Sequence, residues 1–150
     1  MTSRRRLFLI PGLLATSTAL GAFNPQSYLD GNPRTKTDNQ LYPVLVVGVD
    51  GVKPHANPVA VTPGPHWLEI QAPPADTLAG RRTPKSQTFV LKIEPCTRYF
   101  LGAHKDSPLV DKWKLVVDQV ETVKGCDPAE ELKKFPDESL RAAPKPPAAH

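Results

Sequence analysis

The chain lacks the short motifs that mark many enzymes and metal sites. It contains no G-x-S-x-G or H-E-x-x-H pattern for hydrolysis. Its cysteines and its histidines His55, His66 and His104 form no C-x2-C or H-x3-H pair of the kind that binds zinc. We therefore expect no catalytic residue, no metal and no cofactor, and we predict a protein that is not an enzyme.

The chain also lacks a real surplus of positive charge. Its net charge is +4, but Arg4, Arg5 and Arg6 supply three of these charges, and without them 16 basic residues face 15 acidic ones. A chain near neutrality has no electrostatic reason to bind nucleic acid or an anionic membrane. We expect no nucleic-acid partner.

The N-terminus resembles an export signal. The arginines precede a mostly apolar stretch, Leu7–Leu20, and Ala19-Leu20-Gly21 places small residues at positions −3 and −1 of a cut before Ala22. The stretch is short and interrupted by proline and glycine, which is unfavourable for a transmembrane helix. We predict a signal peptide over residues 1–21, a periplasmic or secreted mature protein, and no stable membrane insertion after cleavage. The pattern R-R-L-F-L at 5–9 leaves both the general secretory and the twin-arginine route open.

Cysteine is scarce, with only Cys96 and Cys126 present. In an oxidising compartment two cysteines most simply form one disulfide. We expect their Cα atoms to lie within about 7 Å of each other.

Proline and glycine separate short apolar runs along the chain, which is typical of an all-β protein with many turns. We predict a flexible lead-in over 22–37, with docking of Tyr28-Leu29 left open as an alternative. A small antiparallel β-sandwich of six to seven strands follows over 38–126, and a charged, Pro/Ala-rich tail over 127–150. The expected strands are 42–49, 58–62, 66–71, 87–94, 97–103 and 112–124.

Three local predictions refine this outline. Strands 87–94 and 97–103 form a hairpin, because a short Pro-Cys link joins them. The valine-rich segment 109–123 favours a strand over a helix, although both remain open. Asp127-Pro128 begins a short charged helix, whose apolar face is only Leu132 and Phe135. The expected core contains Val46, Leu68, Ile70, Phe89, Leu91, Leu101 and Val117, with Tyr99 and Trp113 also inside.

Part of the sequence resembles a known module. Val49-Asp50-Gly51, a short strand, and then Pro63-Gly64-Pro65-His66 opening an alternating strand are similar to the PEGA-type pattern. Such modules are prealbumin-like or carboxypeptidase-regulatory-like β-sandwiches of bacterial envelope proteins. The resemblance covers about 42–99, and it departs from the P-E-G-A tetrapeptide itself. It implies a fold and a compartment but no catalytic residues.

Trp67 and the basic loop that follows it suggest a binding surface. Trp67 alternates out of phase with Leu68 and Ile70, so it points away from the core. Arg81 and Arg82 lie in the loop 72–86. Together these three residues could contact an anionic or glycan ligand. The alternative is that Trp67 packs beneath a loop and the arginines are merely solvated.

Two functions are compatible with these features. The first is a non-catalytic exported module that binds, or structurally supports, an unidentified envelope protein or glycan. The second is an accessory or inhibitor-like protein that acts on a partner enzyme or complex through the 72–86 loop.

Overall fold

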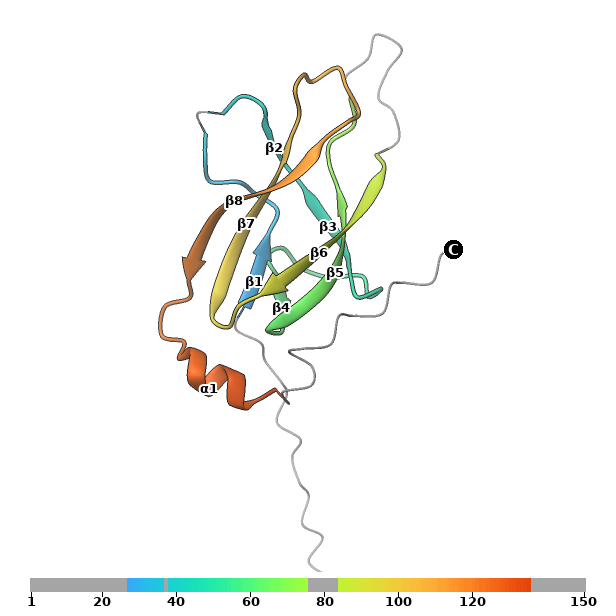
Figure 1. Ribbon diagram of the computed structural model, residues 1–150. Coiled ribbons are helices and arrows are strands. Elements are labelled where there is room, and N and C mark those ends of the chain that lie inside the picture. The colour runs from blue at the N-terminus through green and yellow to red at the C-terminus, as the bar shows by residue number, and fades with distance from the viewer. Residues whose placement is uncertain (1–26, 37, 76–83, 136–150) are drawn as a thin grey trace, which may run out of the picture.

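Two β-sheets packed face to face form the body of the protein (Figure 1). The computed structural model describes residues 27–36, 38–75 and 84–135. The elements in this part of the chain are β1 (Ser27–Asp30), β2 (Leu41–Pro43), β3 (Leu45–Val49), β4 (Val59–Val61), β5 (Gly64–Gln71), β6 (Ser86–Ile93), β7 (Thr97–His104), β8 (Lys114–Thr122) and α1 (Pro128–Lys133). The predicted β-sandwich class is confirmed, and the predicted signal peptide lies outside the described residues.

The two sheets differ in width. Sheet A contains β4, β1, β2, β7 and β8, and sheet B contains β3, β5 and β6. Because β8 pairs along the whole of β7, the strands β1 and β2 share the opposite edge of β7, next to residues 98–100 and 102–104. At the end that contains β1 and β4, sheet A is therefore four strands wide and sheet B three, whereas at the β2 end both sheets are three strands wide. The β1–β7 pairing is parallel, whereas the other pairs of named strands are antiparallel.

The segment 27–30 corrects the expectation of a flexible lead-in and agrees with the alternative that Tyr28-Leu29 is docked. It forms β1, which lies between β7 and β4, and Leu29 is completely buried. The Ser27 hydroxyl donates a hydrogen bond to the Glu94 carbonyl at 3.0 Å, and Asp30 forms an ion pair with Arg98 at 2.5 Å. These partners lie 67 and 68 residues away along the chain, so no local pattern reveals them.

The predicted hairpin of 87–94 with 97–103 is wrong. The strand β6 belongs to sheet B and β7 to sheet A, so the chain crosses between the sheets at the Pro95-Cys96 link. Cys96 adopts a positive φ of 56°, which turns the chain sharply. The Glu94 N–H donates to the Tyr99 hydroxyl at 2.9 Å and bridges the two sheets beside this crossing. Each strand turns its apolar face to the same core from opposite sides.

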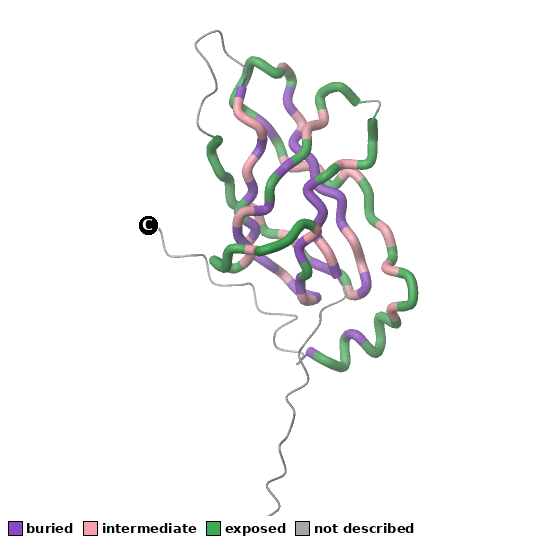
Figure 2. Tube along the Cα trace, turned by 180° about the vertical axis from the view of Figure 1, so that it is seen from behind, coloured by how far each residue is buried: buried purple, intermediate pink, exposed green. Residues whose placement is uncertain are grey.

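One hydrophobic core fills the space between the sheets, and Figure 2 shows buried positions along the strands of both. Its buried residues are Leu29, Val44, Val46, Val59, Val61, Leu68, Ile70, Ala72, Ile93, Tyr99, Leu101, Ala103 and Trp113. Phe89 and Leu91 are only partly buried against this cluster. The prediction that Val117 belongs to the core is wrong, because its side chain is 38% exposed on the outermost strand of sheet A.

The two C-terminal elements agree with the sequence. The open question over 109–123 is resolved, since its central part forms strand β8. The helix α1 begins after Asp127, whose carboxylate accepts hydrogen bonds from two N–H groups of the first turn. Phe135 is buried just beyond the helix, whereas Leu132 is 37% exposed. Among the described residues, no helix has the length and apolar character needed to cross a membrane.

A second buried cluster lies on the outer face of sheet A. Phe100 is 1% exposed, although its neighbours Tyr99 and Leu101 point the other way, into the core. The guanidinium groups of Arg34 and Arg98 lie 4.5 and 5.0 Å from the centroid of the Phe100 ring. The segment between β1 and β2 therefore crosses the outer face of sheet A and helps to cover this ring.

Asp118 attaches the crossing segment to β8. It lies where the register of β7 and β8 shifts, and its carboxylate accepts the N–H groups of Arg34 and Thr35 at 2.6 and 2.9 Å. The Thr35 hydroxyl lowers the pKa of Asp118, burial opposes this, and the two N–H groups lower the pKa further. Burial raises the pKa of Asp30, but hydrogen bonds led by the Arg98 side chain outweigh it and lower the pKa overall.

Acid should destabilise the protein through these two carboxylates. Their pKa values are lower in the folded chain than the ordinary value of 3.8, so they stabilise the fold above that value and lose this effect as the pH falls through the folded pKa. The free energy of unfolding should therefore begin to fall below about pH 5 and continue to fall as the pH passes through the folded pKa values. The variants Asp30→Asn and Asp118→Asn should each show a shallower fall in urea titrations. A pH dependence identical to that of the wild type in both variants would contradict this assignment.

Candidate binding surface

One side of the sandwich is open. The strands β6 and β8 each pair along one edge, with β5 and β7, and within 27–36, 38–75 and 84–135 no strand pairs with their other edges. The Glu94–Tyr99 hydrogen bond ties the end of β6 to β7, so sheet B stops above β7 and leaves part of β8 uncovered. We define the open side as the apolar residues between the two free edges: Phe89, Leu91, Leu115, Val117 and Val120.

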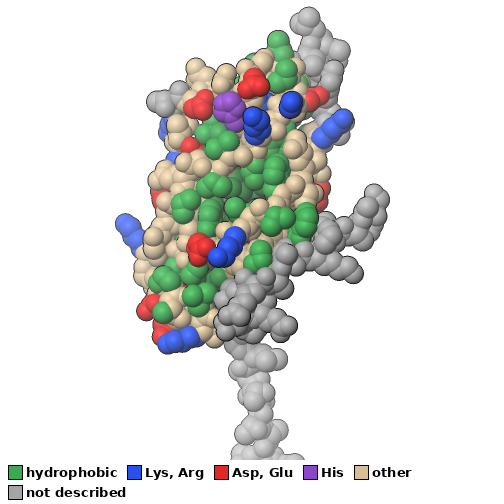
Figure 3. All heavy atoms as spheres, in the orientation of Figure 1, with side chains coloured by type: hydrophobic (Ala, Val, Ile, Leu, Met, Phe, Trp, Pro, Cys, Tyr) green, Lys and Arg blue, Asp and Glu red, His purple; other side chains and the backbone are tan. Residues whose placement is uncertain are grey.

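The valines of the open side point inward but remain exposed. In the β7–β8 ladder Val117 lies opposite Leu101, and Val120 lies opposite Tyr99. Cross-strand partners share one face of a sheet, and both partners here belong to the core. Val117 is nevertheless 38% exposed and Val120 54%. Figure 3 shows hydrophobic side chains gathered in a diagonal band across this face of the molecule.

A pocket lies at each end of β6. The pocket at its beginning has a volume of about 170 Å³ and is lined by Pro73, Pro84, Gln87 and Trp113, among others. Trp113 also packs against Phe89, with ring centroids 5.4 Å apart. The pocket at the end of β6 has a volume of about 240 Å³, and its lining includes Gly64, Ile93, Pro95 and Leu132. The open side therefore extends along β6 between two hollows.

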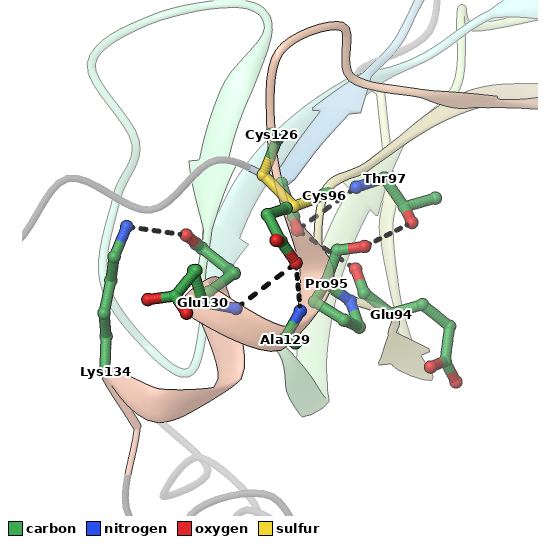
Figure 4. The surroundings of a disulfide bond; sticks show 11 residues. Glu94, Pro95, Cys96, Thr97, Cys126, Ala129, Glu130 and Lys134 are labelled. Carbon is green, nitrogen blue, oxygen red and sulfur yellow. Dashed lines mark hydrogen bonds and ion pairs between the residues drawn. A yellow bond between two sulfur atoms is a disulfide. The ribbon is translucent and has the colours of Figure 1, made fainter.

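The disulfide predicted from the sequence is confirmed. Cys96 and Cys126 are bonded with their Cα atoms 5.6 Å apart, and Cys96 is fully buried. The bond joins the beginning of β7 to the segment between β8 and α1 (Figure 4). The Val123 N–H also donates to the Cys96 carbonyl at 2.8 Å. Such a structural disulfide indicates an oxidising compartment.

The structure describes only part of the predicted site. Trp67 is half-buried on the outer face of sheet B, opposite Val90, and so points away from the core as expected. Arg81 and Arg82 lie outside the described residues. The open side is a different surface, which the sequence did not reveal. The apolar residues Leu115, Val117 and Val120 of β8 were the available signal, but they indicate an open surface only once sheet B is known to end at β6.

His66, in strand β5, is held by polar groups of two neighbouring segments. Its Nδ1 lies 2.6 Å from Asp50 Oδ2, and its Nε2 lies 2.8 Å from the Thr62 carbonyl oxygen. Both ring nitrogens are therefore occupied by neighbouring polar groups of the same chain. Asp50 also accepts the Trp67 N–H at 2.8 Å, which fixes the start of the turn. In the part of the chain that the structure describes, no group of three or more His, Cys, Asp or Glu residues could hold a metal ion.

No family model, curated protein or solved structure matches this chain. The open side is therefore interpreted from its own residues. In the described part of the chain, these apolar side chains lie between the free edges of β6 and β8. An exposed apolar surface of this kind is suited to binding a partner.

Proposed function

We propose that the protein is a non-catalytic module, exported to the periplasm or beyond, that binds another component of the bacterial envelope. The observation that carries this proposal is the open side, where Val117 and Val120 align with the core yet remain exposed. Exposed apolar surface of this kind is stabilised when a partner covers it. Of the two expected partners, an envelope protein or a glycan, apolar contact favours the protein.

Three further features support export and an envelope role. The Cys96–Cys126 disulfide suits an oxidising compartment. The pattern of residues 1–21 favours a signal peptide. The turn at Asp50-Gly51 and the strand that begins at Gly64 are compatible with a PEGA-like module.

Photo-crosslinking in cells tests this function. A photoreactive amino acid replaces Val120 on the open side, and a matched one replaces Val90, which is also 54% exposed but lies on the outer face of sheet B. We expect one defined adduct in the envelope fraction from position 120 and none from position 90. Adducts of equal yield at both positions, or none at either, would count against a binding role for the open side.

Sequencing of the exported protein should give an N-terminus at Ala22 or Phe23.

A further inference from the structure

We infer that the partner at the open side is an extended polypeptide strand that pairs with the free edge of β6 and covers β8. This inference rests on the proposed binding function and specifies how the partner is held. Sheet B is one strand narrower than the end of sheet A that contains β1 and β4, and the exposed inward-facing Val117 and Val120 of β8 place the missing position beside β6. A strand added there would lie about 4.8 Å from β6 and about 10 Å above sheet A, which is the spacing of packed sheets.

The side chains beneath that position fit an added strand. Val117 and Val120 belong to the inward face of sheet A, but no strand of sheet B in the described residues lies above them. Leu91 and Leu115 are likewise only partly buried. Alternate side chains of an added strand would point at these four residues, while the others would face solvent. The backbone of the strand would satisfy the unpaired N–H and C=O groups of β6.

The length of β6 sets the length of the partner segment. The strand has 8 residues, from Ser86 to Ile93, and a pocket lies at each end of it. A segment of about eight residues would span the edge, at about 3.3 Å per residue. A bulky apolar side chain near the Ser86 end of the edge would then reach the pocket at Trp113.

A second copy of the chain fits this position poorly. If the β6 strands of two copies paired antiparallel about a two-fold axis, the two copies of sheet B would form one continuous sheet. Both copies of sheet A would then lie on the same face of that sheet. At Glu94 and Tyr99 β6 lies over β7, so β8 of one copy would there lie beneath β6 of the other copy, in space that the second sheet A needs. A separate extended segment meets no such obstacle, so the geometry favours a different polypeptide as the occupant.

A defined peptide tests the inference directly. The probe is a fluorescein-labelled peptide of about nine residues in which valine and threonine alternate between terminal lysines. The mature protein should bind it saturably, and amide hydrogens of β6 should exchange more slowly in the complex. A probe in which every backbone N–H is methylated should not bind, because it can donate no hydrogen bond to the free edge of β6.

The matched variants locate the site on the protein. Val120→Asp should weaken probe binding about tenfold or more, because the complex would bury an unpaired charge. Val90→Asp, at the same 54% exposure on the outer face, should change binding by less than about twofold. Circular dichroism should show that both variants are folded.

Several results would overturn the inference. They are absence of binding up to about 1 mM probe, equal binding of the methylated and unmodified probes, or equal effects of the two aspartate variants. Sedimentation that reveals a dimer, dissociated by Val120→Asp, would identify a second copy as the occupant instead. If the position-120 adduct forms in cells while the probe fails to bind, the binding function stands and only the strand mode is rejected.

Discussion

Phe100→Ala should lower the free energy of unfolding by about 3–5 kcal/mol, the usual cost of removing a fully buried phenylalanine ring. Phe100 is 1% exposed, although it lies on the face of sheet A that points away from sheet B. Its ring is covered by Arg34, from the segment between β1 and β2, and by Arg98 of β7. Removing the ring would leave a cavity beneath both guanidinium groups and weaken the hold of this segment on the sheet.

Urea unfolding followed by circular dichroism measures this loss. Val90→Ala is a suitable control, because Val90 also lies within a strand but is 54% exposed. The control should change the free energy of unfolding by less than about 1 kcal/mol. If Phe100→Ala proved as mild as this control, the outer face of sheet A would contribute little to stability.

Replacing both cysteines with alanine should cost about 3–4 kcal/mol, with the chain-entropy model as the guide. Cys96 and Cys126 close a loop with a sequence separation of 30, so the bond restricts the unfolded chain substantially. The melting temperature should fall by on the order of 10 °C, given the size of the domain.

Reduction of the wild-type protein provides the matched comparison. Dithiothreitol should lower its melting temperature nearly as far as the double substitution does and should leave the alanine variant unchanged. A melting temperature for the alanine variant equal to that of the oxidised wild type would show that the hydrogen bonds of the β7–β8 ladder suffice without the bond.

The β class could be predicted because turn residues and alternating apolar residues are local features. The alternation of Leu68 and Ile70 marks β5 directly, and the valine-rich segment 109–123 favours β8 on the same grounds. The arrangement of the strands could not be predicted, because it depends on distant partners. β1 is held by contacts to Glu94 and Arg98, and β6 and β7 separate into different sheets despite their short link.

The candidate surface was harder to predict than the fold. Val117 has the spacing of a core residue, and its register places it on the inward face as expected. Whether such a residue is buried depends on how far the opposite sheet extends, and no pattern within β8 carries that information. Trp67 could be placed outside the core because the alternation of β5 alone decides its face.

The position of β1 within sheet A also bears on the order of folding. This strand comes before all the other described elements, yet its parallel partner β7 lies about 70 residues later. Closing so large a loop is entropically costly, so topologies of this kind fold slowly, in about milliseconds to seconds. During synthesis, β1 must wait for β7 to emerge before it can take its place between β7 and β4. Until then sheet A stays incomplete, because β1, β2 and β8 all pair with β7, whereas sheet B contains only strands that precede β7 in the chain.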